Sequence, residues 1–351
     1  MRIRRSKLVA LTVALASVTA ACSSTTKAAP ITTAKPAEAT AATTAPAGDT
    51  TTSGAKPVAG AAIKIAVNPW TGSAVNANVA KVVLETKLAT SVSLVELDEN
   101  AAWVGLDDGS LDANLEVWPS GHAADYDKYV TSKKSVVDLG KLGPAAKIGW
   151  YVPSYVIEQY PSLATWEGFK DVKLAKLFAS AESGDQGQFL MGDASYVTFD
   201  EQIIASLGLP LKYTVAGSEA ALIAAVQKAV ADKKPILLQF WQPHWLQNVI
   251  KLTEVKLPAI TDACTASKAA NAGKGDGKYA CDYPVDNLYK VASAGLGAKN
   301  KAASDFLAKF SLTTAQQNEI AGMVDKDKKT PEAAAKEWIA AHGDVVDGWL
   351  K

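Results

Sequence analysis

Residues that serve most enzymatic and metal-binding chemistry are scarce in this chain. It has three Cys and three His among 351 residues, and it contains no G-x-S-x-G elbow, no Walker loop and no G-x-G-x-x-G fingerprint behind a strand. The Gly-rich run NAGKGDGK lacks the Ser or Thr that follows the Lys of a phosphate-binding loop. The separation of the cysteines suits no common zinc site. We therefore expect no enzymatic activity, no cofactor and no bound metal.

An excess of charge of either sign is also missing. The 36 basic and 36 acidic residues balance, and the chain has no basic stripe and no nucleic-acid-binding motif. Without the four basic residues at the extreme N-terminus, 32 basic and 36 acidic residues remain, a net charge of −4. A nucleic-acid partner is therefore not expected.

The N-terminus has the composition of a targeting segment. Basic residues precede an apolar run, Leu8–Ala21, that is too short to span a bilayer as a stable helix. The small residues before Cys22 resemble the lipobox of bacterial lipoproteins, although Thr19 replaces its usual Leu. We expect residues 1–21 to be a lipoprotein signal peptide and Cys22 to be lipidated. The alternative is a plain secretory peptide that is cut after Ala21.

A linker follows the targeting segment. Residues 22–60 are almost entirely Ala, Thr, Ser, Pro and Gly, without apolar periodicity. Such a composition cannot bury a core and is typical of a disordered, flexible tether. A tether behind a lipid-accepting Cys suits a domain that is anchored to the outer face of the cytoplasmic membrane.

The two remaining cysteines, Cys264 and Cys281, flank a polar loop rich in Gly and Lys. In an oxidising compartment outside the cytoplasm they are expected to pair. Closing this loop would contribute about 3 kcal/mol of stability on a loop-entropy estimate. We therefore predict a disulfide between them.

Strand and helix patterns alternate along the part of the chain that follows the linker. The predicted strands are Ile63–Val67, Ser91–Leu97, Leu111–Trp118, Lys147–Pro153, Pro235–Trp241 and Val285–Ser293. Helical patterns separate them, among them Ala101–Gly109 and Glu219–Ala231, and helices fill the C-terminal part. This alternation predicts an α/β fold with parallel sheets.

Three tryptophans, Trp70, Trp118 and Trp241, lie where predicted strands end. Ligands of α/β sheets bind beyond the carboxyl ends of strands, and aromatic faces attract cations. The pattern therefore indicates a shared cleft for a cation, and packing of the rings in the core is the alternative that the spacing leaves open. Near the third ring, His244 is expected to point to solvent and Trp245 to pack under its loop.

Five short motifs occur in a characteristic order. They are VNP after the first strand, W-x-x-x-H at Trp118–His122, AKLF at Ala175–Phe178, W-x-P-x-W at Trp241–Trp245 and DGW at Asp347–Trp349. In this order and spacing the chain resembles, over essentially all of Ile63–Leu350, the glycine betaine/proline betaine substrate-binding proteins of bacterial ABC importers. The resemblance implies a bilobal, type II-like periplasmic-binding-protein fold, with two parallel-sheet lobes and a ligand cleft between them. Residues 61–149 plus 286–351 are then expected to form lobe I, and residues 150–285 lobe II.

The resemblance also implies an aromatic cage. Trp118 and Trp241 match two of the three rings that surround the trimethylammonium group in this family. The third ring falls in a turn that reads ASYVTFDE here, which makes Tyr196 its candidate. Trp70 and Trp150 have weaker counterparts or none, and they are expected as additional walls.

A carboxylate-binding end is implied as well. His122 matches a His that hydrogen-bonds the ligand carboxylate, and the backbone N–H groups of Val197 and Thr198 match the amides that share it. Choline lacks this carboxylate, so the resemblance ranks it below the betaines.

The implied function is that of an extracytoplasmic, lipid-anchored solute-binding protein. It would capture glycine betaine or a related quaternary-ammonium solute and deliver it, as a monomer, to an ABC permease and its ATPase. The alternatives are a sensor- or receptor-type lipoprotein of the same fold, or an importer component specific for choline or carnitine.

Overall fold

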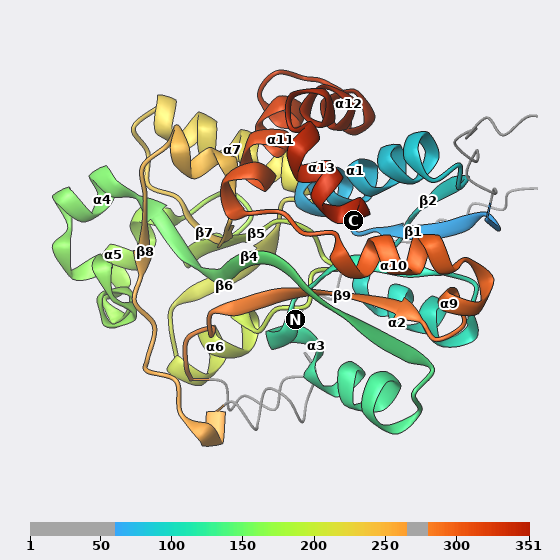
Figure 1. Ribbon diagram of the computed structural model, residues 1–351. Helices are drawn as coiled ribbons and strands as arrows, with labels where there is room; N and C mark the ends of the chain where they lie inside the picture. Colours follow the sequence, from blue (N-terminus) through green and yellow to red (C-terminus); the bar gives the residue numbers. More distant parts are fainter. Residues whose placement is uncertain (1–59, 265–279) are drawn as a thin grey trace, which may run out of the picture. The chain divides into compact units, whose positions relative to one another are not determined.

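The computed structural model describes residues 60–264 and 280–351 (Figure 1). The predicted signal peptide, the predicted tether and the predicted lipidation site Cys22 lie outside these residues, apart from the last residue of the tether. The strands are β1 Ile63–Val67, β2 Val92–Glu96, β3 Ala113–Val117, β4 Val136–Pro153, β5 Gly187–Met191, β6 Leu211–Val215, β7 Leu237–Gln242, β8 Leu252–Val255 and β9 Asp286–Ser293.

Helices separate most of these strands and fill the C-terminal part of the chain. The α-helices are α1 Thr71–Lys87, α2 Glu99–Asp108, α3 Pro119–Asp125, α4 Ser154–Gln159, α5 Val172–Ala175, α6 Asp200–Leu207, α7 Glu219–Ala231, α9 Leu296–Lys299, α10 Lys301–Lys309, α11 Thr314–Asp325, α12 Pro331–Ala341 and α13 Gly343–Leu350. Short 3-10 and π turns are η1 Tyr126–Ser132, η2 Pro161–Ala164, η3 Trp166–Lys170, η4 Lys176–Phe178 and η5 Trp245–Asn248. The predicted α/β class is confirmed.

The long strand β4 connects the two halves of the hydrogen-bonded sheet. The strands of the described residues follow the order β2-β1-β3-β9-β4-β7-β5-β6, with β8 paired to β4. Up to Ala146, β4 pairs antiparallel with β9, and from Lys147 on it pairs antiparallel with β7. Figure 1 shows β4 and β9 running side by side across the molecule.

Parallel pairing joins strands on either side of the central strands β4 and β9. It joins β1 to β2 and β3 in one half, and β5 to β6 and β7 in the other. The central strands β4 and β9 are antiparallel to their neighbours, so each half is mixed rather than wholly parallel. The division into lobes at residues 149/150 and 285/286 stays a prediction.

Buried residues hold β1 and β3 in the sheet, and a helix follows each of the two strands. In β1, Ile63 and Ile65 are completely buried, and all five residues of β3 are buried. Each strand ends where a helix begins: Trp70 precedes α1, and Trp118 precedes the Pro at the first position of α3. Proline suits this position because its fixed φ is helical and its missing N–H would have no partner there.

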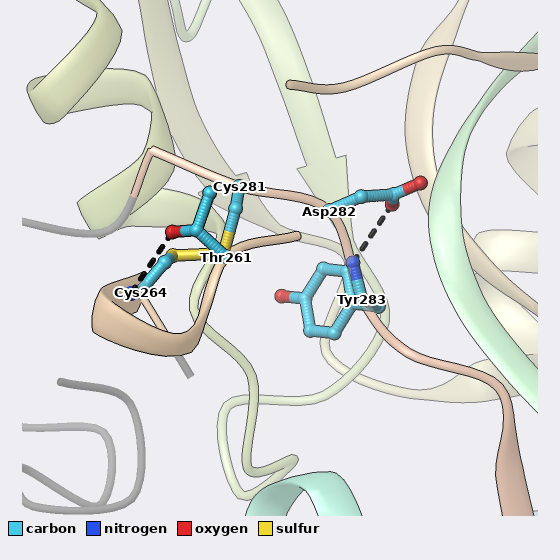
Figure 2. The surroundings of a disulfide bond; sticks show 5 residues. All are labelled: Thr261, Cys264, Cys281, Asp282 and Tyr283. Atoms are coloured by element: carbon cyan, nitrogen blue, oxygen red, sulfur yellow. Dashed lines mark hydrogen bonds between the residues drawn. A yellow bond between two sulfur atoms is a disulfide. The ribbon is translucent and has the colours of Figure 1, made fainter. Parts of the chain in front are cut away.

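The predicted disulfide between Cys264 and Cys281 is confirmed, with Cα atoms 6.3 Å apart (Figure 2). Two residues beyond it, the Tyr283 hydroxyl donates to Asp200 Oδ1 at 3.0 Å and accepts from the Phe199 N–H at 2.7 Å. These contacts lie at the start of α6. The disulfide therefore fixes the segment that holds this helix N-terminus.

Candidate functional site

A cavity with about 370 Å³ of empty space lies near the carboxyl ends of β1, β3, β5 and β7. Its lining joins four aromatic rings to one carboxylate, one amide and three smaller residues: Trp70, Glu99, Trp118, Ile148, Tyr196, Val197, Thr198, Gln239 and Trp241. Six of the eight predicted ligand residues line this cavity, and His122 and Trp150 do not.

Aromatic rings from both halves of the sheet meet at the cavity. The Tyr196 ring meets Trp70 edge to face at 5.8 Å between centroids, and meets Trp241 in the same way at 5.7 Å. The Tyr196 hydroxyl donates to the Pro69 carbonyl at 3.1 Å. Burial raises the pKa of this hydroxyl well above its usual value, so it stays neutral. Tyr196 therefore bridges a ring that follows β1 and a ring on β7.

A buried carboxylate, Glu116 of β3, holds two of these rings from behind. Its Oε1 accepts from Trp70 Nε1 at 2.7 Å and from Trp118 Nε1 at 3.1 Å. Its Oε2 accepts from the side-chain amides of Asn76 at 2.6 Å and Gln317 at 2.8 Å. Burial raises the pKa of Glu116 to about 7, although these hydrogen bonds favour the charged form. Glu116 therefore fixes the orientation of both indoles.

A second carboxylate, Glu99 of α2, faces the groups that were predicted to bind a ligand carboxylate. Its Oε2 accepts from the Val197 N–H at 3.0 Å. Its Oε1 lies 3.1 Å from His122 Nε2, an ion-pair contact whose angle departs from hydrogen-bond geometry. A Cβ on Gly121 would lie 3.2 Å from the Val197 carbonyl oxygen, so this position favours a glycine. The predicted roles of His122 and Val197 toward a ligand stay predictions.

The His122 ring is buried between two carboxylates. Its Nδ1 lies 2.9 Å from Asp125 Oδ2, and its Nε2 faces Glu99. Burial alone would lower the pKa of His122, but the two carboxylates outweigh burial and raise the pKa to about 9. At neutral pH the ring is therefore a buried cation.

Trp150 lies on β4, and its side chain packs into the core rather than lining the cavity. Its side chain is fully buried, its Nε1 donates to Asp200 Oδ1 at 2.7 Å, and its ring packs on Phe189 with centroids 4.7 Å apart. Asp200 also accepts a hydrogen bond from the Tyr283 hydroxyl. In this position Trp150 supports the start of α6, which follows the turn that carries Tyr196.

Beside the cavity, a polar cluster joins α1 and α11 to α7 and the segment after β7. His244 Nε2 lies 3.0 Å from Glu219 Oε1, and the Thr71 hydroxyl oxygen lies 2.9 Å from both Glu219 Oε2 and Asp325 Oδ1. The side-chain atoms of Glu219, His244 and Asp325 that could bind a metal ion lie within 4.8 Å of one another.

The prediction that His244 points to solvent is wrong. The ring contacts Glu219 in the interior, and only 6 % of His244 is exposed. Trp245 is buried as predicted, and its Nε1 donates to Asp325 at 2.6 Å.

Sequence reasoning missed four residues of the site. Ile148 and Gln239 carry a signal, because Ile148 pairs with Trp241 across β4 and β7, and Gln239 precedes Trp241 by two residues on the same face. Glu116 has a weaker signal as the one charge in a buried strand. Glu99 has none, since its contact with Val197 joins residues that lie 98 positions apart.

Solved structures that resemble this one define its fold. The crystal structure of lactococcal OpuAC, closed and complexed with glycine betaine, has a TM-score of 0.63 at 24% identity, covering 82% of this chain and 99% of that chain. A choline-binding protein of an ABC transporter in complex with choline also has a TM-score of 0.63, at 19% identity, covering 82% and 91%. The fold is thus that of the bilobal periplasmic binding proteins.

The family follows from the sequence. Residues 61–341 match the family described as the substrate binding domain of ABC-type glycine betaine transport systems, and the chain belongs to this family. Its members are extracytoplasmic binding components of importers, which work with an ABC permease and are not enzymes. Among residues 60–264 and 280–351, no helix has the length and apolar character needed to cross a membrane.

Two curated relatives cover most of the chain. The trimethylamine N-oxide-binding protein of Pelagibacter ubique is 28% identical over 294 residues, 82% of this chain and 90% of that protein. The glycine betaine/proline betaine-binding periplasmic protein of Salmonella typhimurium is 25% identical over 268 residues, 73% of this chain and 79% of that protein.

Proposed function

We propose that this protein captures a small solute with a trimethylammonium group in its aromatic cavity and delivers it to an ABC permease. The observation that carries the proposal is the convergence of Trp70, Trp118, Tyr196 and Trp241 on one cavity. The ligand class includes glycine betaine and related compatible solutes.

The physical chemistry of the cation fits this lining. A trimethylated nitrogen has no N–H to donate, and its charge is spread over methyl groups that water hydrates weakly. Each aromatic face contributes about 0.5–2 kcal/mol of cation–π attraction, and more in a dry site. The carboxylate of Glu116 behind Trp70 and Trp118 adds an attractive charge at their N–H edges. The four aromatic faces therefore favour a quaternary cation, whereas a primary ammonium gains most from hydrogen-bond acceptors.

The ligands for which the relatives are named support the same chemistry. These relatives include proteins that bind trimethylamine N-oxide, glycine betaine, proline betaine and carnitine. All four solutes carry a fully substituted nitrogen.

The N-terminal sequence supports attachment to the membrane. We infer that Cys22 is lipidated and that residues 22–60 tether the binding domain to the outer face of the cytoplasmic membrane, near its permease. Capture and delivery then need only one copy of the chain.

Calorimetric titration of the purified protein with methylated and unmethylated partners tests the proposal. Choline is compared with ethanolamine, and glycine betaine with glycine. We expect at least one methylated solute to bind at least about thirtyfold more tightly than its unmethylated partner, a difference of about 2 kcal/mol. Measurable but equal affinities within both pairs, or no binding of choline, glycine betaine and trimethylamine N-oxide, would refute the proposed function.

A further inference from the structure

The carboxylate of Glu99 faces two of the three groups that were predicted to bind a betaine carboxylate, the Val197 N–H and the His122 ring. It accepts from the Val197 N–H at 3.0 Å and lies 3.1 Å from His122 Nε2. Glu99 is only 7 % exposed, and its side chain lines the aromatic cavity. The chain thus supplies its own carboxylate at this end of the site.

The surrounding charges leave little attraction for a second carboxylate. The cationic ring of His122 already has a protein carboxylate at each nitrogen, Glu99 at Nε2 and Asp125 at Nδ1. A ligand carboxylate near Val197 would therefore meet the negative charge of Glu99 at short range, in a buried site where like charges repel strongly. A ligand with net positive charge, or a neutral dipole without a carboxylate, avoids this repulsion.

The cavity offers a neutral polar group instead. Gln239 is 2 % exposed, lines the cavity, and has a side-chain oxygen without a hydrogen-bond partner among the described residues. A buried amide oxygen without a partner is costly, which favours a ligand that satisfies it or its neighbouring N–H group. A ligand hydroxyl can donate to this oxygen, whereas an N-oxide oxygen can only accept, from the N–H group of the same amide.

We propose that Glu99 takes the place of a ligand carboxylate, so that this site selects trimethylammonium solutes that have no carboxylate. Gln239 then faces the hydroxyl or N-oxide end of the ligand. This inference rests on the proposed function and narrows its substrate class. It reverses the order that the family resemblance implies, in which the betaines precede choline. Glu99 is then a specificity-determining residue.

The first test compares three probes on the purified protein: choline, trimethylamine N-oxide and glycine betaine. We expect choline or trimethylamine N-oxide to bind at least tenfold more tightly than glycine betaine. If glycine betaine binds most tightly, this inference is wrong, while the proposed function stands. If none of the three probes binds, the proposed function and this inference fall together.

Substitution of Glu99 provides the second test. In Glu99→Ala, the Val197 N–H and the His122 cation become available, so the affinity for glycine betaine should rise at least tenfold relative to the affinity for choline. Glu99→Gln keeps the shape of the side chain and should shift the ratio in the same direction by a smaller factor. Glu201→Gln, an exposed glutamate of α6, is the matched control and should leave the ratio unchanged. An unchanged ratio in both Glu99 variants, with the fold intact by circular dichroism, would overturn the inference.

Discussion

Replacing Glu116 with Gln removes one buried charge and can keep its hydrogen bonds. The Oε1 of Gln can accept both indole N–H groups that Glu116 accepts now. The amide oxygens of Asn76 and Gln317 have no hydrogen-bond partner among the described residues. If these two amides turn over, they accept from the new Gln N–H groups. Glu116→Gln is therefore a test of charge rather than of shape.

The raised pKa of Glu116 sets the expected magnitude. Burial moves its pKa from 4.5 to about 7, which corresponds to about 3 kcal/mol. Because the pKa is higher in the folded state, the penalty for the charged form is absent below pH 4.5 and complete above about pH 7. Glu116→Gln should therefore be more stable than wild type by up to about 3 kcal/mol at pH 8, and nearly equal to it at pH 4.5.

The same charge should attract the bound cation, so the variant should lose affinity while it gains stability. At pH 8 we expect choline to bind Glu116→Gln about fivefold more weakly than wild type, a loss of about 1 kcal/mol. The affinity of wild type should fall as the pH drops through about 7, and the variant should show a flatter profile. His122 does not interfere, because its pKa of about 9 keeps it charged below pH 8.

Urea unfolding at pH 4.5 and pH 8, together with fluorescence titration across this range, measures both effects. Glu201→Gln serves as the exposed control in both assays. A variant that is less stable than wild type at pH 8, or a wild-type affinity that does not change with pH, would refute this reasoning about Glu116.

Two further predictions concern the cysteines. Cys22→Ala should release the protein from the membrane fraction, and a variant that still fractionates with membranes like wild type would contradict lipidation at this residue. Paired Cys264→Ser and Cys281→Ser substitutions should lower the free energy of unfolding by about 3 kcal/mol and leave solute affinity unchanged. Mass spectrometry that finds both thiols free in protein from the cell envelope would contradict a disulfide in the native protein.

The parts of the fold that local pattern determines were predictable. The apolar alternation of Ile63–Val67 gave β1 with its observed bounds, and the rings that follow β1 and β3 reach the cavity because parallel strands end at the same edge. The first half of β4 was missed, because Val136–Ala146 contains exposed and charged residues that resemble a loop. Pairing with β9 holds that segment in place, and such a long-range contact leaves no local signal.

The polar part of the site was beyond sequence reasoning for a similar reason. From the sequence, His244 resembles a surface residue. In the structure it is buried beside the carboxylate of Glu219, which lies 25 positions earlier in the chain. Glu99 reaches a backbone N–H 98 positions away, and neither residue has a spacing that would indicate the contact. The resemblance assigned His122 to a ligand, but it could not show that a carboxylate of the chain itself faces this ring.

Titration of choline into the Trp118→Ala and Trp241→Ala variants tests most directly whether the aromatic cavity binds the cation. Trp166→Ala, at a half-buried ring outside the cavity lining, is the control. Each cavity variant should bind about thirtyfold more weakly than wild type, a loss of about 2 kcal/mol, and the control should bind like wild type. If both cavity variants keep wild-type affinity with the fold intact by circular dichroism, the cavity is not the cation site.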